Sequence, residues 1–170
     1  ESVSHILNVA DNYKMPVNLI DPNDINSPGL NPFIFDSPLS ISTAISTVLK
    51  GLYAANLKTI DMAYVEVMST QAIENLAILL KVMYPRLHDG DLPNLEDMME
   101  CLNDFSLVES LCEKMKEDEE LRQEYKLLLS FFKKNFYENS SGKADMEKYV
   151  SAATSQLEIL LRYPGVKNIL

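Results

Sequence analysis

The sequence predicts an all-α protein: a single compact domain of about six to seven helices, preceded by a short extended N-terminal segment. Three observations predict this fold class. Apolar residues make up 46% of 170 residues, which is enough to give one domain a real core. Apolar side chains recur at spacings of three and four along most of the chain, as in amphipathic helices. Glycine occurs only five times.

The first 36 residues are expected to differ from the rest. Residues 2–14 predict a short helix that ends at Met15-Pro16, because helical backbone is disfavoured before a proline. Residues 17–20 form a short strand-like run. Residues 21–36 contain three prolines and three asparagines, which is typical of a turn-rich loop. We therefore expect residues 1–36 to lead into an all-α domain that comprises residues 37–170.

Two long helices are expected next, over residues 39–53 and 61–84. Ser37-Pro38 supplies an N-cap followed by a proline at the first helical position, where proline is tolerated. Pro85 and the turn His88-Asp89-Gly90-Asp91 are expected to end the second helix. The apolar residues expected along the inward stripe of the first helix are Leu39, Ile41, Ile45, Val48, Leu49 and Leu52. Those of the second helix are Val65, Met68, Ala72, Leu76, Leu79, Leu80 and Met83.

The second half of the chain predicts four further helices. Asn94 is expected to cap one of them, with Asp97 three residues later, and Ser106–Glu109 fits the capping-box pattern of the next. The last two are expected over residues 118–137 and 143–162, joined by a flexible link at 139–142. Their inward residues are expected to be Leu121, Tyr125, Leu128, Leu129, Phe132, Met146, Tyr149, Val150, Ala153, Leu157 and Leu161.

The net charge of −10 is concentrated in one stretch. Residues Asp89–Glu124 contain thirteen acids and three bases, whereas acids and bases balance in the rest of the chain. Such an acidic body repels phosphate backbones, so direct nucleic-acid binding by this domain is disfavoured.

Five acids of this stretch are candidate partner-binding residues: Glu96, Glu100, Glu113, Glu117 and Glu120. A basic segment of another protein is the partner that their charge favours. The alternative is a solvated polar face, because acids in the first turn of a helix also complement the helix dipole. The methionines fall mainly on apolar stripes and are expected in the core, with an adaptable peptide groove as the alternative.

No residue set predicts catalysis, cofactor binding or metal binding. Ser141-Gly142-Lys143-Ala144 has Tyr137 where a phosphate-binding loop needs glycine and Ala144 where it needs Ser or Thr. His88 with Asp89 and Asp91 lacks the ligand spacing of a calcium loop and predicts a polar turn. Cys101 and Cys112 are expected to be reduced and structural.

The sequence also predicts no membrane contact. No apolar run approaches the roughly 18 residues of a membrane-spanning helix. No basic stretch followed by an apolar one begins the chain, so a secretory signal is not predicted. We expect a cytoplasmic domain.

Two segments resemble a known family. Val17-Asn18-Leu19-Ile20-Asp21-Pro22-Asn23-Asp24 and Ser27-Pro28-Gly29-Leu30-Asn31-Pro32-Phe33 resemble the conjugative-transfer ATPases of type IV secretion, including the coupling proteins of the FtsK/HerA superfamily. Residues 39–80 look like the first helices of the all-α domain inserted in those motors. Residues 157–170 are similar to the segment that returns to the motor.

The resemblance implies that this chain is a non-catalytic recognition domain. The phosphate-loop Lys of the motor would lie upstream of Glu1 and its second acidic motif beyond Leu170, so ATP and Mg²⁺ are expected only in the parent protein. The implied partners are a secretion substrate, a relaxase or an accessory protein. The parent is expected to be hexameric at the inner face of the bacterial membrane, and the isolated domain monomeric. Asp21, Pro22, Asn31 and Pro32 would form the hinge from the motor into the helical domain.

Two other functions stay open. The chain could be a free-standing helical adaptor or regulator unrelated to conjugation, or a helical enzyme. A reading frame that extends upstream into a phosphate-binding loop would favour the recognition domain, whereas nucleotide binding detected by calorimetry would favour the enzyme.

Overall fold

The computed structural model describes the backbone of residues 2–17, 19, 21, 23–26, 31–54, 60–138 and 140–162. Side chains are described for the same residues except 2, 48–54, 60–63, 152, 153, 156, 159 and 160. These ranges contain eight α-helices, one short 3-10 helix and one π-helical segment, and no strand. The predicted all-α fold class is confirmed, with a helix count slightly above the expected six to seven.

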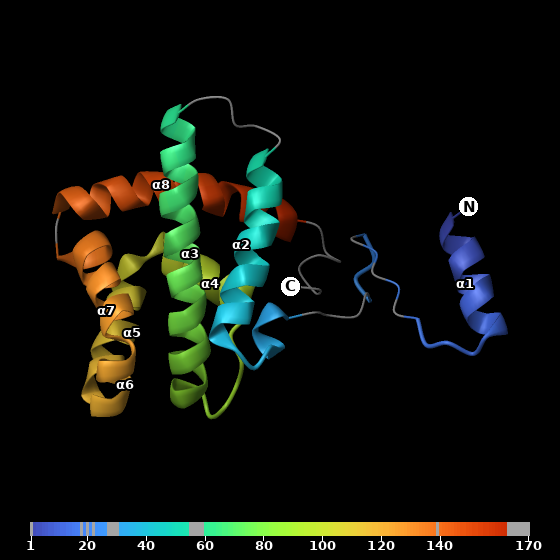
Figure 1. Ribbon diagram of the computed structural model, residues 1–170, viewed down its shortest axis with the longest axis horizontal. Helices are drawn as coiled ribbons and strands as arrows, with labels where there is room; N and C mark the ends of the chain where they lie inside the picture. Colours follow the sequence, from blue (N-terminus) through green and yellow to red (C-terminus); the bar gives the residue numbers. More distant parts are fainter. Residues whose placement is uncertain are drawn as a thin grey trace.

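The helices form a bundle around one central helix (Figure 1). α3 stands in the middle, α2 runs beside it, and α8 crosses one end of both. α5, α6 and α7 lie on the other side of α3, and α1 lies away from the bundle. The elements are α1 (Ser2–Asn12), η1 (Pro32–Ile34), α2 (Pro38–Ala54), α3 (Ile60–Leu87), α4 (Leu95–Asn103), α5 (Phe105–Glu117), α6 (Glu119–Glu124), α7 (Lys126–Phe132), η2 (Lys133–Tyr137) and α8 (Ser140–Leu161).

α3 supplies the centre of the hydrophobic core. Ala72, Ile73, Leu76 and Leu79 are fully buried, and Leu80 is nearly so. The helix is buried around more of its circumference than a surface helix because α2, α4, α5 and α8 all pack against it. Its predicted inward residues from Ala72 onward are therefore confirmed.

The segment before α2 is attached to this core by Phe33, whose side chain is fully buried. The Asn31 side chain caps η1 by accepting a hydrogen bond from Phe33 N at 2.9 Å, and its Nδ2 donates to Pro93 O at 2.7 Å. Lys81 Nζ donates to Phe33 O at 2.7 Å. η1 therefore packs as a part of the helical core, although the sequence placed residues 31–33 in a turn-rich loop.

A second part of the core is aromatic. Phe136, in the π-helical segment η2, is fully buried and lies 4.2 Å from Phe105 and 4.9 Å from Phe132 between ring centroids. The Phe132–Phe136 pair meets edge to face, the arrangement that the ring quadrupoles favour. This contact joins α5, α7 and η2 into one unit.

The predicted start of α4 is confirmed. Asn94 Oδ1 accepts hydrogen bonds from Glu96 N at 2.7 Å and from Asp97 N at 3.1 Å, and Asp97 Oδ2 accepts one from Asn94 N at 2.8 Å. This reciprocal capping box satisfies backbone N–H groups that have no partner inside the helix.

Replacing Asn94 by alanine is expected to lower the free energy of unfolding by about 1 kcal/mol, because alanine cannot accept these two hydrogen bonds. Urea unfolding followed by circular dichroism would measure the change. Asn103→Ala is the control, since Asn103 is exposed at the other end of α4. Equal stability of Asn94→Ala and the unmodified protein would contradict the capping role.

The predicted cap of α5 was wrong by two residues. Asp104, not Ser106, is the N-cap, and its Oδ1 accepts from Ser106 N at 2.9 Å and from Ser106 Oγ at 2.7 Å. Phe105 can then be the first helical residue and be buried in the core. The packing of Phe105 thus fixes where the helix begins.

The sequence predicted that α3 ends at Pro85, but the helix passes through this residue. The helix continues to Leu87, with Pro85 in its last turn, where proline forfeits a single backbone hydrogen bond. The chain turns at His88–Gly90, with Gly90 at a φ of 96° that glycine adopts without strain. Gly90 N donates to Pro85 O at 2.8 Å and closes the end of the helix.

The helix expected over residues 118–137 is interrupted. Its start at Asp118 is confirmed, since this side chain caps α6, but Tyr125 leaves helical geometry with a ψ of 23°. The backbone ladder resumes at once, with Leu129 N donating to Tyr125 O at 2.9 Å. The flexible link expected over residues 139–142 is wrong at residues 140–142, because α8 begins at Ser140, and residue 139 lies outside the described residues.

The inward stripe predicted for α2 is only partly correct. Ile41 and Ile45 are buried, but Leu39 is 69% exposed, so it lies outside the buried face of α2. The predicted Val48, Leu49, Leu52 and Ala153 lie outside the described side chains, as do residues 18 and 20 of the strand-like run. The methionines expected in the core are buried at Met83, Met98, Met99, Met115 and Met146.

Candidate partner-binding site

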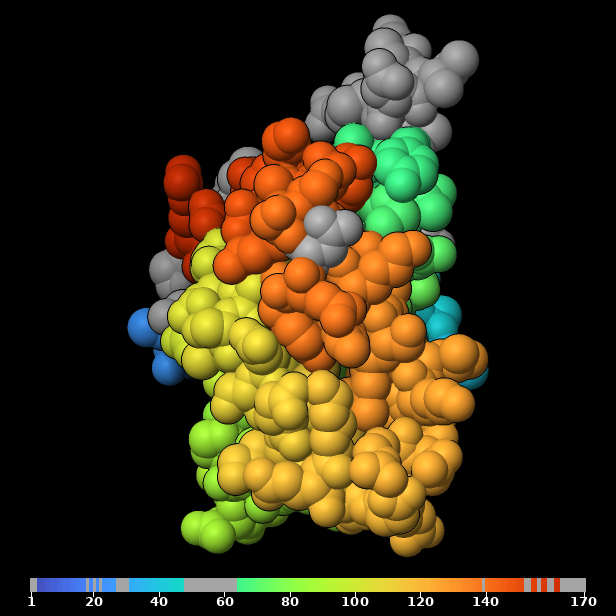
Figure 2. Space-filling view, turned by 90° about the vertical axis from the view of Figure 1, so that its left-hand side faces the viewer, coloured from blue at the N-terminus to red at the C-terminus, as the bar shows by residue number. Residues whose placement is uncertain are grey.

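The acid-rich stretch forms the turn after α3 and the helices α4, α5 and α6. Figure 2 shows α5 and α6, in yellow to gold, on the face of the molecule below α8. Each helix buries apolar residues on one side, such as Met98 in α4 and Met115 in α5. The acids on the opposite side are consequently at the surface, which is the polar face of an amphipathic helix.

All five predicted acids are exposed. Glu96 and Glu100 are four residues apart on α4, and Glu113 and Glu117 are four residues apart on α5, so each pair shares a helix face. Glu120 lies in the first turn of α6. The sequence thus placed these side chains correctly at the surface.

Lysines on the same helix offset part of this charge. Lys116 Nζ lies 2.6 Å from Glu113 Oε1, and Lys114 Nζ lies 3.2 Å from Glu117 Oε1. Both pairs are largely exposed to solvent and contribute little to stability. Glu100 and Glu120 form no ion pair within the described part of the chain, so their charges are the more available to a partner.

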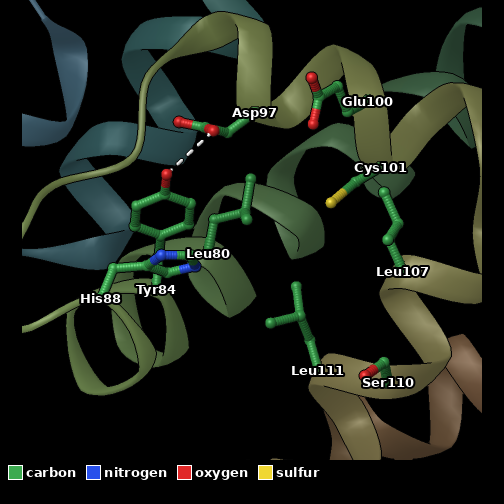
Figure 3. Close-up of a pocket in the computed structure, with 9 residues that line it drawn as sticks. All are labelled: Leu80, Tyr84, His88, Asp97, Glu100, Cys101, Leu107, Ser110 and Leu111. Atoms are coloured by element: carbon green, nitrogen blue, oxygen red, sulfur yellow. Dashed lines mark hydrogen bonds between the residues drawn. The ribbon is translucent and has the colours of Figure 1, made fainter.

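A hollow of about 310 Å³ lies between α3, α4 and α5 and includes Glu100 (Figure 3). Its apolar wall consists of Leu80, Cys101, Leu107 and Leu111. Its polar residues are Tyr84, His88, Asp97, Glu100 and Ser110. We call it the α3–α5 hollow.

One side of the α3–α5 hollow is an ordered aromatic pair. The rings of Tyr84 and His88 are stacked with centroids 4.0 Å apart and an interplanar angle of 19°. The Tyr84 hydroxyl donates to Asp97 Oδ1 at 3.1 Å, drawn as a dashed line in Figure 3. Since the same carboxylate closes the α4 capping box, Asp97 holds the end of α3 against the start of α4.

The α3–α5 hollow is electrostatically negative. Burial, and after it the hydrogen bond and charge of Asp97 and the charges of Asp91 and Glu100, raise the pKa of the Tyr84 phenol. Burial first, then Asp97, Glu100 and Asp104, raise the pKa of the Cys101 thiol to about 12. Both groups are therefore neutral at physiological pH, and no lysine or arginine is among the described residues that line the hollow.

Glu117 lines a different hollow, of about 460 Å³, near the end of α3. There it shares the wall with Asp118 and with two bases, Arg86 and Lys114. Glu96, Glu113 and Glu120 line neither hollow. The structure therefore spreads the five predicted acids over the exposed faces of α4, α5 and α6 and does not collect them in one pocket.

The residues predicted to form the hinge have separate local roles. Asp21 Oδ1 accepts from Asn23 N at 2.9 Å in a tight turn. Pro22 lies outside the described residues. Asn31 and buried Pro32 begin η1, which the hydrogen bond from Asn31 to Pro93 fastens to the start of α4.

Sequence reasoning missed the cluster of Tyr84, His88 and Asp97. It placed His88 correctly in the turn after α3, but it predicted neither the stack of His88 on Tyr84 nor the hydrogen bond from Tyr84 to Asp97. Tyr84 and His88 are four residues apart, the spacing at which helical side chains meet, and this was the signal that could have found the stack.

Neither a metal-binding group nor a membrane-spanning helix is present within the described ranges. No group of three or more His, Cys, Asp or Glu residues there is placed to hold a metal ion. None of the helices in those ranges combines the length and the apolar character needed to cross a bilayer.

Comparison with protein-family models, with curated proteins and with solved structures finds no match to this chain.

Proposed function

We propose that this chain is a non-catalytic recognition domain that receives a basic segment of a protein partner on the surface of α4, α5 and α6. The observation that carries the proposal is the separation of charge: the whole net charge of −10 resides in the stretch that forms this surface. Such a field attracts basic partners, orients them and excludes acidic ones.

The resemblance of the N-terminal segments to conjugative-transfer ATPases suggests the process in which this recognition would take place. A recognition domain of a type IV secretion motor would bind a secretion substrate, a relaxase or an accessory protein. ATP and Mg²⁺ would belong to the motor domains of the parent protein. A cytoplasmic adaptor outside conjugation could use the same acidic surface, and the identity of the captured partner distinguishes the two.

Charge reversal on this surface is expected to weaken capture of the partner. Glu117→Lys combined with Glu120→Lys should reduce binding of a relaxase or accessory protein about tenfold at low salt, and less at high salt, because screening shortens the range of the attraction. A pull-down across a salt series would measure it.

The matched control is Glu147→Lys with Glu158→Lys. It changes the net charge equally, but both residues are exposed on α8. The proposal predicts a smaller effect for this pair. Binding that does not respond to the α5–α6 reversal at any salt concentration would refute the electrostatic recognition.

A further inference from the structure

We propose that the α3–α5 hollow binds one arginine side chain, a step that rests on the proposed function because the arginine would belong to the basic segment that docks on the acidic surface. The hollow, its aromatic wall and its carboxylates together define this ligand chemistry.

The negative charge of the hollow favours a cationic ligand. Glu100 has no ion-pair partner in the described part of the chain, and Asp97 Oδ1 keeps one lone pair after accepting the Tyr84 hydrogen bond. A ligand that brings only N–H donors would satisfy both carboxylates. Charge-assisted hydrogen bonds of this kind are among the stronger polar contacts in proteins.

The shape of the hollow favours arginine over lysine. The stacked rings of Tyr84 and His88 form the aromatic wall of the hollow, and each ring keeps one free face. A planar guanidinium can stack on such a face, whereas an ammonium has no plane to stack. Leu107 and Leu111 lie across the hollow from this wall (Figure 3). They offer apolar contact to the methylene groups of the side chain.

Cys101 is a second, independent indication that the hollow accepts a donor. The residue is only 5% exposed, its thiol is free, and its Sγ points into the hollow (Figure 3). It forms no hydrogen bond to the described part of the chain. A thiol sulfur is a weak acceptor that an arginine N–H could reach without displacing a protein group.

The volume is consistent with one side chain. At about 310 Å³ the hollow is at the lower end of the range of small-molecule sites, so it suits an anchoring residue of a peptide. The rest of the segment would then extend over the exposed acids of α5, of which Glu109 and Glu113 lie next along the helix.

The test compares two short peptides by NMR titration of the full chain: a peptide of arginine, glycine and serine, and its twin with lysine at each arginine. We expect the arginine peptide to bind about fivefold more tightly. Its largest amide shifts should fall at Tyr84, His88, Glu100 and Ser110, which line the hollow.

Two variants distinguish a specific arginine-binding site from non-specific electrostatic attraction. Glu100→Gln removes one carboxylate, and Ser110→Trp fills the hollow from an exposed position, so neither should impair folding, which circular dichroism would verify. Each should weaken arginine-peptide binding about fivefold. Glu147→Gln, an exposed acid on α8 outside the hollow and outside the proposed path of the segment, is the control and should have a smaller effect.

Equal affinity for the two peptides, an unchanged affinity of Ser110→Trp, or no binding of either peptide would overturn the arginine site. The proposed function is tested separately, by the pull-down. It would still hold after such a result if charge reversal at Glu117 and Glu120 weakens capture of the partner. Conversely, arginine selectivity with unaffected capture would uphold the hollow and refute the proposed function.

Discussion

Replacing Phe33 by alanine is expected to lower the free energy of unfolding by about 3–5 kcal/mol. Phe33 is fully buried although it lies in a short 3-10 turn outside the predicted helical domain. The substitution removes apolar contacts and leaves a cavity between η1 and the core. Its backbone oxygen would also be held less firmly against Lys81 Nζ. Urea unfolding of the full chain would measure the loss.

Phe35→Ala provides the matched control for this prediction. Phe35 lies two residues away, carries the same side chain and is 44% exposed, so its truncation should cost much less. A similar loss for both variants would show that η1 is not anchored by Phe33. Such a result would indicate that residues 31–36 are a loop that leads into the bundle and not a part of its core.

Alkaline pH is expected to destabilise the folded protein through its two buried thiols. Burial is the largest cause that raises the pKa of Cys101 and of Cys112 from 9.0 to about 12. A raised pKa means that folding favours the protonated thiol. The stabilisation is therefore complete below about pH 9 and is lost as the pH rises towards about 12.

The expected loss is about 2 kcal/mol per thiol between pH 9 and roughly 10.5, since each pH unit above the unfolded-state pKa corresponds to about 1.4 kcal/mol. Urea unfolding at a series of pH values would give the slope. Burial raises the pKa of the phenols of Tyr84 and Tyr137 in the same direction, so they add to the alkaline loss.

Cys101→Ala combined with Cys112→Ala removes both thiols, together with the contribution of Cys112 that helps to raise the pKa of Tyr137. The double variant should be less stable at neutral pH because it loses two buried sulfur atoms. Its stability should nevertheless fall less steeply above pH 9 than that of the unmodified protein. Parallel pH profiles for the two proteins would contradict the assignment of the alkaline loss to these cysteines.

Local signals in the sequence located most of the helices. The asparagine at position 94 and the aspartate three residues later predicted the capping box that starts α4, because both partners of a capping box lie within one turn. The prediction failed at Asp104, where two polar residues compete for one cap and the burial of Phe105 decides between them. It failed at Pro85 because a proline in the final turn of a helix forfeits only one backbone hydrogen bond.

The candidate site was less predictable than the helices. Exposure of Glu100 and Glu113 follows from helical periodicity alone, and the sequence anticipated it. The α3–α5 hollow combines Tyr84 from α3, Asp97 from α4 and Ser110 from α5. No spacing in the sequence encodes a meeting of three helices, so the hollow could be found only after they were packed.

The sequence by itself determined the all-α fold class, the position of most helices and the segregation of negative charge into residues 89–124, because periodicity, caps and charge are properties of neighbouring residues. The tertiary structure decided which apolar side chains are covered. It buried Phe33 and exposed Leu39, although both are apolar residues near the start of α2. It also brought Tyr84 and Asp97 together. These outcomes depend on which helix faces meet, and that is set by contacts between residues far apart in the chain.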